Sequence, residues 1–228
     1  MSRVRAGDGA FGTALRAGLA GLGVPITDDA LEALTRHFIL LIEANQHINL
    51  TRITDPTEAA LRLYADSAAV PAWASQRGIA VKSVLDVGSG AGFPALPLAV
   101  LQPAWKVTAV EATGKKAAFI ESTVRALGLP NVRAVHAHSE HWSCETRFDV
   151  ITFKAVGALE GCLACAADRV LAGGHVAVYK TANLSTQETE TGGRAARKYG
   201  LESVQGLTYS LPLPDGPGQF ALHVFRRR

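Results

Sequence analysis

The sequence predicts an α/β fold, and two features of its pattern carry the prediction. From about residue 79 onwards, short apolar and β-branched runs alternate with segments of helical periodicity, as in a mostly parallel sheet covered on both faces. Before that point, the apolar residues recur only at helical spacing. A chain of 228 residues, of which 48% are hydrophobic, is long enough to bury one such core. We therefore expect a Rossmann-like sheet domain over residues 79–228 and an α-helical cap over residues 1–78, packed as one unit.

Three helices are expected in the cap. The first follows a weak apolar pattern through Phe11, Leu15 and Leu19. The second begins after Thr27, because threonine is a good N-cap and apolar residues follow at positions 31, 34, 38, 41 and 42. A polar turn over residues 49–51 ends it. The third opens at Asp55-Pro56, since proline is tolerated in the first turn of a helix.

Beyond the cap, five parallel strands should alternate with helices. The expected strands cover residues 81–87, 106–111, 131–137, 148–153 and 175–179. The expected helices cover residues 92–101, 114–127 and 159–171. A terminal antiparallel pair of strands, 201–211 and 220–225, ends the sheet. Residues 185–198 form a polar stretch to which no element is assigned.

The sheet domain is organised around residues 84–97. Its first strand contains Asp86, and Gly88, Gly90 and Gly92 follow at alternate positions. Glycine permits positive φ and a close approach of the backbone to a ligand, while the next helix directs N–H groups to the same place. A dinucleotide site has the spacing Gly-x-Gly-x-x-Gly and holds a pyrophosphate, whereas an acid before the turn suits the ammonium group of S-adenosylmethionine (SAM). We favour SAM, with nucleotide or NAD binding and a purely structural turn as the alternatives.

A second acid stands at the end of the second strand. Glu111 lies about 20 residues after the glycines, where a carboxylate can accept hydrogen bonds from both ribose hydroxyls of a nucleoside. An exposed acid at a strand end is the alternative. Lys115 and Lys116 follow at once, and they fit either a solvated helix start or a contact for phosphates.

Composition limits the partners. The net charge of +3 permits an anionic partner without requiring one. Cys144, Cys162 and Cys165 are too few and unsuitably spaced for a disulfide framework or a zinc site, so we expect core thiols and no metal. No apolar run reaches the roughly 18 residues of a membrane span, and the N-terminus lacks the apolar core of a signal peptide. We expect a cytoplasmic monomer without a membrane partner.

Motifs along much of the chain carry a family resemblance. They are Asn49-Leu50-Thr51, Asp55-Pro56, Arg62, Asp66-Ser67, the segment from Asp86 to Pro94, Leu96-Pro97-Leu98, Gly114-Lys115-Lys116, Phe119, Asn131-Val132, Glu140, Phe148-Asp149 and Lys180. Together they resemble the ribosomal RNA small subunit methyltransferase G family, also called glucose-inhibited division protein B. The glycine loop with its Phe-Pro is the most specific part. The resemblance implies a SAM-dependent methyltransferase that modifies guanine N7 in 16S rRNA and releases S-adenosylhomocysteine.

The resemblance also assigns roles to residues. Gly88, Ser89 and Gly90 would line the methionine end of SAM, Glu111 the ribose, and Ser139-Glu140 the adenine. The predicted cofactor set is completed by Asp86, Gly92, Phe93, Ala112 and Lys154. The predicted RNA contacts are Asn49, Thr51, Arg62, Lys115, Lys116 and Lys180.

Several positions depart from the family pattern. The family usually has Arg-His where this chain has Arg62-Leu63, an Arg within the segment matching residues 138–140, Arg-Ala at Lys154-Ala155, and Lys-Gly at Lys180-Thr181. Arginine binds phosphate through a planar fork that lysine lacks, so these departures concern the RNA contacts. A small-molecule methyltransferase that kept the SAM site, and a SAM-binding or RNA-binding protein without turnover, remain the alternative functions.

The proposed chemistry needs little from side chains. Guanine N7 has a free lone pair at neutral pH, so attack on the sulfonium methyl requires alignment and exclusion of water but no base. Lys154 should follow strand 148–153 directly, and we predict that it positions the acceptor. Phe153 is a predicted stacking partner for the acceptor base, with a core aromatic as the alternative.

Overall fold

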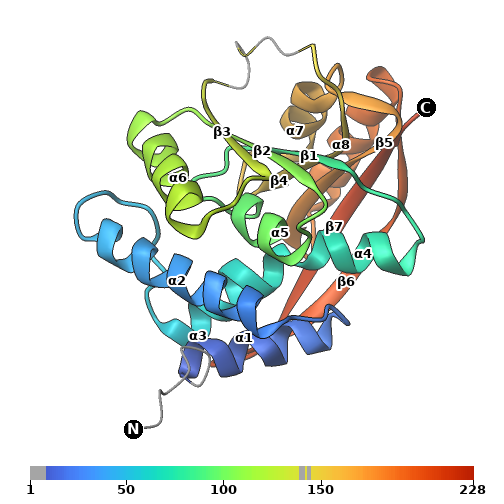
Figure 1. Ribbon diagram of the computed structural model, residues 1–228. Helices are drawn as coiled ribbons and strands as arrows, with labels where there is room; N and C mark the ends of the chain where they lie inside the picture. Colours follow the sequence, from blue (N-terminus) through green and yellow to red (C-terminus); the bar gives the residue numbers. More distant parts are fainter. Residues whose placement is uncertain (1–8, 139–141, 143–144) are drawn as a thin grey trace, which may run out of the picture.

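A seven-stranded sheet forms the centre of the computed structural model, which describes residues 9–138, 142 and 145–228 (Figure 1). The strand order is β3-β2-β1-β4-β5-β7-β6. Strands β1 to β5 are parallel, and β7 is antiparallel to both β5 and β6. The strands are β1 (Ser83–Val87), β2 (Lys106–Glu111), β3 (Val132–His136), β4 (Phe148–Lys154), β5 (Val170–Thr181), β6 (Leu201–Leu213) and β7 (Gly216–Arg227).

The helices precede the sheet or connect its strands. Those of the cap are α1 (Ala10–Gly21), α2 (Asp28–Asn45), α3 (Pro56–Ala59), the π-helix η2 (Ala60–Ala65) and α4 (Ala69–Gln76). Those of the sheet domain are α5 (Ala95–Leu101), α6 (Gly114–Leu127), α7 (Leu159–Ala166) and α8 (Thr186–Lys198). The expected N-caps are present: the Thr27 side chain accepts a hydrogen bond from Ala30 N, and that of Asp55 from Glu58 N.

Two apolar clusters lie on opposite faces of the sheet. Because successive side chains of a strand point to opposite faces, Val84 and Val150 belong to one cluster while their neighbours Leu85 and Ile151 belong to the other. The first cluster is covered by the cap together with α5 and α6, and the second by α7 and α8 (Figure 1). The architecture is therefore a three-layer helix–sheet–helix arrangement.

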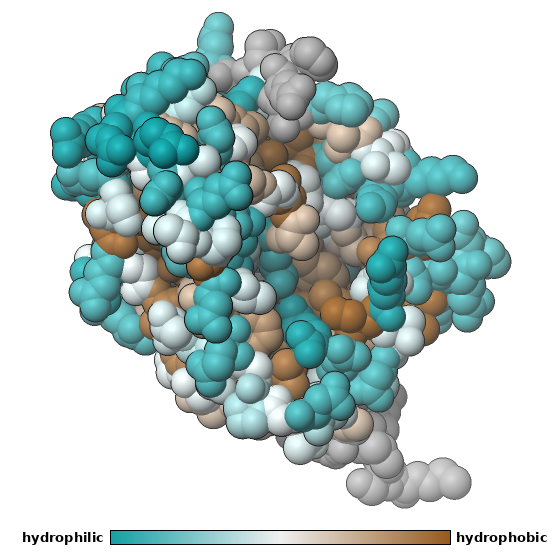
Figure 2. Space-filling model, turned by 180° about the vertical axis from the view of Figure 1, so that it is seen from behind, coloured by the Kyte–Doolittle hydropathy of each residue, from teal (hydrophilic) through white to brown (hydrophobic). Residues whose placement is uncertain are grey.

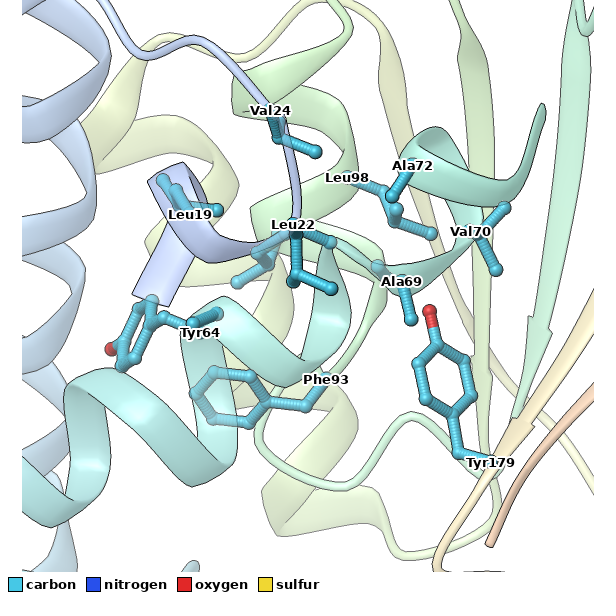
Figure 3. Packing of buried hydrophobic residues seen from close by; sticks show 14 of the residues in the cluster. Leu19, Leu22, Val24, Tyr64, Ala69, Val70, Ala72, Phe93, Leu98 and Tyr179 are labelled. Atoms are coloured by element: carbon cyan, nitrogen blue, oxygen red, sulfur yellow. The ribbon is translucent and has the colours of Figure 1, made fainter. Parts of the chain in front are cut away.

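The cap packs directly on the glycine loop. Phe93, next to Gly92, meets the ring of Tyr64 from η2 edge-to-face, with 4.9 Å between ring centroids (Figure 3). His37 of α2 lies beside the same two rings, at 5.4 Å from Tyr64 and 5.3 Å from Phe93. Figure 3 also shows Leu19 and Leu22 from the end of α1 in this cluster. The cap and the loop thus share one core.

The sequence prediction of the elements is largely confirmed, with several corrections. Helix α4 was not predicted, and strands β6 and β7 extend further towards each other than expected. Strand β2 and helix α6 match it residue for residue. The helix expected over 159–171 ends at Ala166, and β5 begins at Val170. The helix expected over 92–101 begins only at Ala95.

A further correction concerns α8, a helix in the polar stretch 185–198 for which no element was predicted. Its buried residues are Gly192, Ala195 and Ala196, which are too small to give a recognisable apolar pattern. They are small because the neighbour is close: a Cβ on Gly192 would lie 2.9 Å from Leu159 Cδ1.

Strand β6 forms an edge of the sheet and is interrupted by a bulge. Its pairing with β7 shifts between Val204 and Leu207. Inside the bulge, the Gln205 carbonyl accepts a hydrogen bond of 3.0 Å from Trp73 Nε1 of α4. The backbone packs so closely there that a Cβ on Gly206 would lie 1.9 Å from the Leu222 oxygen, so glycine is required.

The surface seen from behind the view of Figure 1 is hollowed near its centre. Apolar residues lie along the floor of this hollow and hydrophilic residues flank it (Figure 2). Within the described part of the chain, no helix is long and apolar enough to cross a membrane.

Candidate cofactor and acceptor site

The glycine loop is folded back on strand β2. Gly88 and Gly90 have φ values of 73° and 58°, which residues other than glycine rarely adopt. The N–H groups of Gly88 and Ser89 both donate to the Val110 carbonyl, at 2.8 and 3.1 Å. These bonds place the loop at the carboxyl ends of β1 and β2, where parallel α/β sheets bind their ligands.

Gly88, Gly90 and Gly92 differ in the space around their Cβ positions. A Cβ on Gly88 would lie 2.9 Å from Val156 Cγ2, and one on Gly92 would lie 2.5 Å from Leu96 Cδ1. A Cβ on Gly90 has its nearest described neighbour, the Gly88 oxygen, at 4.0 Å. Gly88 and Gly92 therefore permit packing within the protein, and Gly90 leaves space for a ligand above the loop.

Asp86 is buried at the end of β1, next to the glycine loop. The side chain is buried, and its two oxygens accept hydrogen bonds from Ala95 N at 3.3 Å and Thr152 Oγ1 at 2.9 Å. Burial raises the pKa of Asp86 to about 6. The carboxylate joins the start of α5 to β4, and its contact with the SAM ammonium group stays a prediction.

Glu111 is placed as a nucleoside acceptor requires. Strand β2 runs parallel to β1, so its last residue ends beside the glycine loop. Glu111 Oε2 accepts a hydrogen bond of 2.8 Å from Gly90 N, and Oε1 accepts one of 2.9 Å from Thr113 N. These two bonds fix the carboxylate, while each oxygen keeps a further lone pair for a ribose hydroxyl. The residues around Gly90 therefore fit SAM.

Lys154 is held by the cap. Its ammonium group donates to the Arg62 carbonyl at 3.1 Å and forms an ion pair with Asp66, whose other oxygen accepts from Tyr209 Oη. The Lys154 and Asp66 side chains are only 13% and 6% exposed. Tyr179 extends the network by donating to the Ser67 carbonyl at 2.8 Å. The ammonium group predicted to position an acceptor is thus bound between cap and sheet.

Two predicted aromatic contacts belong to the core. Phe153 is 1% exposed and lies in the cluster under α7 and α8, on the face of β4 opposite to Lys154. Adjacent strand residues cannot share one site on one face, so the stacking prediction for Phe153 is wrong and the core alternative holds. Phe93 is likewise buried against the cap, where it packs between the cap and the glycine loop.

The polar turn after α2 is organised by a residue that sequence reasoning missed. Asn45 Oδ1 accepts hydrogen bonds from Leu50 N and Thr51 N, and Asn45 Nδ2 donates to the Thr51 carbonyl at 3.0 Å. Thr51 Oγ1 accepts from Ile53 N at 3.0 Å, so this predicted RNA contact shapes the turn itself. Asn49 is exposed. An asparagine at the end of a helix is a sequence signal for such a turn, because its side chain can bond to nearby backbone groups.

The other predicted contacts are spread over the surface around the loop. Arg62 pairs with Glu58 at 2.8 Å, Lys115 is exposed and Lys116 half-buried at the start of α6, and Ala112 is half-buried after β2. Lys180 pairs with Glu188. Ser139, Glu140 and Cys144 lie outside the described residues. Within the described ranges, no three His, Cys, Asp or Glu side chains are grouped to hold a metal.

Comparisons with known proteins identify the family. A family model described as rRNA small subunit methyltransferase G matches residues 30–208. The chain belongs to this family. Curated relatives named ribosomal RNA small subunit methyltransferase G include one from Solibacter usitatus, 38% identical over 77% of this chain and 81% of the relative. One from Myxococcus xanthus is 37% identical over 93% and 96%.

Solved structures of other proteins share the fold of this chain. M. jannaschii TYW2 in complex with AdoMet aligns with a TM-score of 0.53 and 17% identity over 65% of this chain and 70% of that one. The [4+2]-cyclase SpnF aligns with a TM-score of 0.55 and 15% identity over 72% and 80%. Because the fold also serves a cyclase, the assignment as a SAM-dependent methyltransferase depends on the family and not on the fold alone.

Proposed function

We propose that this chain transfers the methyl group of SAM to guanine N7 of 16S rRNA, acting as a cytoplasmic monomer. The observation that supports it most strongly is the Gly90–Glu111 pair in a chain of the rRNA small subunit methyltransferase G family. The relatives are named for action on small-subunit rRNA. SAM itself supplies a methyl group activated by its sulfonium charge.

In this proposal the protein aligns SAM with the acceptor guanine and removes no proton from the guanine. Glu111 binds the ribose hydroxyls, and Gly90 leaves room for the cofactor directly above the backbone. Guanine N7 offers its lone pair without losing a proton, so no general base is needed. Holding two reactants in line contributes up to ~7–11 kcal/mol in favourable cases, enough for alignment to be the main catalytic device.

A groove between helices α2 and α6 suits an RNA segment. It measures about 510 Å³ and lies between the end of α2 and the start of α6, where His47, Lys115 and Phe119 contribute to its wall. Lys115 supplies positive charge for a phosphate, and the apolar part of the groove supplies surface for a base. With Lys116 and the turn after α2, it forms the proposed acceptor surface.

The second candidate function is methyl transfer to a small molecule. Two observations favour it: Lys154 is bound to Asp66 and Arg62 Nε is paired with Glu58, so both cations are already partly neutralised within the protein. Fewer free cations would reduce the counterion release that drives RNA binding.

Labelled methyl transfer tests both candidates. We expect the protein to methylate 16S rRNA, as free RNA or within a small subunit, purified from a strain lacking this gene. RNA affinity should fall steeply between 50 and 200 mM salt, as expected on the order of 10³-fold for about six phosphate contacts. Transfer to guanine N7 located by sequencing would support the proposal. Transfer only to small molecules, with no salt-dependent RNA binding, would contradict it.

A further inference from the structure

We propose that Lys180 and Glu188 position the loop that follows β4, residues 155–158, over the glycine loop and thereby align the reactants for methyl transfer. The effect on turnover rests on the proposed function, whereas the effect on the loop does not. The contacts of Lys180 and Glu188 are with each other and with the backbone of Gly157 and Leu159, so we treat both as positioning residues. We call this ion pair with its two backbone contacts the β4-loop clamp.

The clamp binds both ends of a short backbone segment. Lys180 Nζ donates to the Gly157 carbonyl at 2.7 Å and pairs with Glu188 Oε1 at 2.7 Å. The same Glu188 oxygen accepts a hydrogen bond of 3.2 Å from Leu159 N, at the start of α7. One ion pair between β5 and α8 therefore provides hydrogen-bond partners for the Gly157 carbonyl and for the Leu159 N–H group.

The clamped loop has an unfavourable backbone conformation. Ala155 has a φ of 57° and is the one non-glycine residue with positive φ in the described part of the chain. Gly157 also has positive φ, at 43°. A non-glycine residue in this region is strained and persists only where surrounding contacts impose the conformation. The clamp supplies such contacts on the carboxyl side of Ala155.

The loop in turn covers the glycine loop. Val156 packs so closely on Gly88 that an added Cβ would lie 2.9 Å from its Cγ2 atom. The Val156 carbonyl accepts a hydrogen bond of 3.2 Å from Cys162 Sγ, which ties it to α7. Strands β1 and β4 are neighbours, so their two carboxyl-end loops meet where the cofactor and the acceptor must approach each other. A shift of residues 155–158 would change that approach.

The ion pair is stable at neutral pH. The hydrogen bond from Lys180 lowers the pKa of Glu188, so the carboxylate stays ionised. The two side chains are 19% and 24% exposed, which screens the pair less than a pair on the open surface. The imidazole of His223 on β7 also faces this pair, and burial lowers its pKa.

The first experiment compares Glu188→Ala with Glu190→Ala on full-length protein. Glu190 lies on the same helix, is 64% exposed and stands 4.0 Å from Arg194, so it controls for loss of an acid from α8. We expect Glu188→Ala to lower kcat about tenfold while leaving SAM Kd within about threefold, because displacement of an aligned group by about 1 Å costs up to 10²-fold in rate. Equal kcat values for the two variants would overturn the proposal.

A charge swap separates positioning from simple pairing. Lys180→Glu combined with Glu188→Lys restores an ion pair but places an acid against the Gly157 carbonyl and an ammonium group against Leu159 N. We expect kcat to stay low in the double variant, whereas Glu188→Gln should recover part of it, since its carbonyl still accepts from Leu159 N. Wild-type kcat in the swapped protein would show that charge pairing alone suffices and would contradict the clamp.

Hydrogen exchange gives a readout that needs no substrate. The peptide covering residues 155–159 should exchange at least about tenfold faster in Glu188→Ala than in Glu190→Ala. Lys180→Met serves as the second variant if Glu188→Ala does not fold, and it should show the same acceleration. Unchanged exchange in this peptide would overturn the clamp even if 16S rRNA proves not to be the substrate, and an inactive wild type with fast exchange in the variants would contradict only the proposed function.

Discussion

The cofactor side and the cap side of the site are built by different means. On the cofactor side, the backbone of residues 88–92 and one carboxylate, Glu111, make the contacts, and their partners are close in sequence or in adjacent strands. On the cap side, Lys154, Asp66 and Tyr209 come from three distant segments and bind one another. The first arrangement leaves groups available to a ligand, whereas the second uses its charges to join cap and sheet. A charged residue at a strand end therefore does not by itself identify a ligand contact.

The largest effect should follow a change at the centre of the cofactor side. Gly90→Val should abolish detectable SAM binding, because valine resists a φ of 58° and would fill the space above the loop. Gly78→Val is the matched control, since Gly78 has a φ of 62° with no described atom near its Cβ position. Calorimetry should give normal affinity for the control. Unchanged SAM affinity in folded Gly90→Val would place the cofactor elsewhere.

On the cap side, Lys154→Met should mainly reduce stability. Removing one partner of a buried pair costs about 3–5 kcal/mol, because the remaining charge stays buried without compensation. Urea denaturation should show this loss in the free energy of unfolding. Arg125→Met provides the control: Arg125 pairs with Glu121 at 2.7 Å on the open surface, where about 0–1 kcal/mol is expected. If Lys154→Met lowers the free energy of unfolding by less than about 1 kcal/mol but reduces methyl transfer at normal SAM affinity, Lys154 positions the methyl acceptor as first predicted.

The two sides should also respond to pH in opposite directions. Burial lowers the pKa of His37, on the cap side, to about 4, and raises that of Asp86, next to the glycine loop, to about 6. Between about pH 4 and 6.5 the unfolded chain binds a proton on His37 that the folded protein does not, so this group makes the free energy of unfolding rise with pH. Between about pH 4 and 6 the folded protein keeps a proton on Asp86 that the unfolded chain has lost, so that contribution falls with pH.

Each of these contributions amounts to about 3 kcal/mol, and in the wild type they should largely cancel. His37→Phe removes the rising one. Relative to the wild type, the unfolding free energy of the variant should therefore fall by about 2 kcal/mol between pH 4 and 6, measured by urea denaturation at several pH values. Parallel curves for the two proteins would show that His37 does not titrate differently in the folded and unfolded states.

The smallest effect is expected at Glu111. Glu111→Ala removes a charged acceptor, which is worth roughly 1.5–3 kcal/mol, or about one to two decades in SAM affinity. Glu121→Ala, an exposed acid on α6, should leave SAM Kd unchanged. Less than a twofold change on Glu111→Ala would exclude the ribose contact and would leave the carboxylate as a support for Gly90 and Thr113.

The same contrast explains what the sequence could predict. The first strand, the glycine turn and the position of Glu111 beside that turn could be predicted, because they follow from a local pattern and from the parallel order of β1 and β2. The pairing of Lys154 with Asp66 depends on how the cap docks, which no spacing along the chain reveals. Phe153 was wrongly expected to share a site with Lys154. The sequence could not show that β4 continues to Lys154, and residues 153 and 154 of one strand point to opposite faces. Helix α8, with its Glu188, was missed because its buried face consists of glycine and alanine.

The bulge in β6 has a consequence for how copies of the chain meet. An edge strand with regular unpaired N–H and C=O groups is a template for another strand, and association through such edges leads to aggregation. At this edge, the pairing with β7 slips between Val204 and Leu207, and the Gln205 carbonyl is already bonded to the Trp73 indole. Arg77 Nη1 adds a charged group there by donating to Gln205 Oε1 at 2.7 Å. A second chain therefore finds an interrupted ladder at the bulge, with the Gln205 carbonyl already bonded, and this opposes further growth of the sheet at β6.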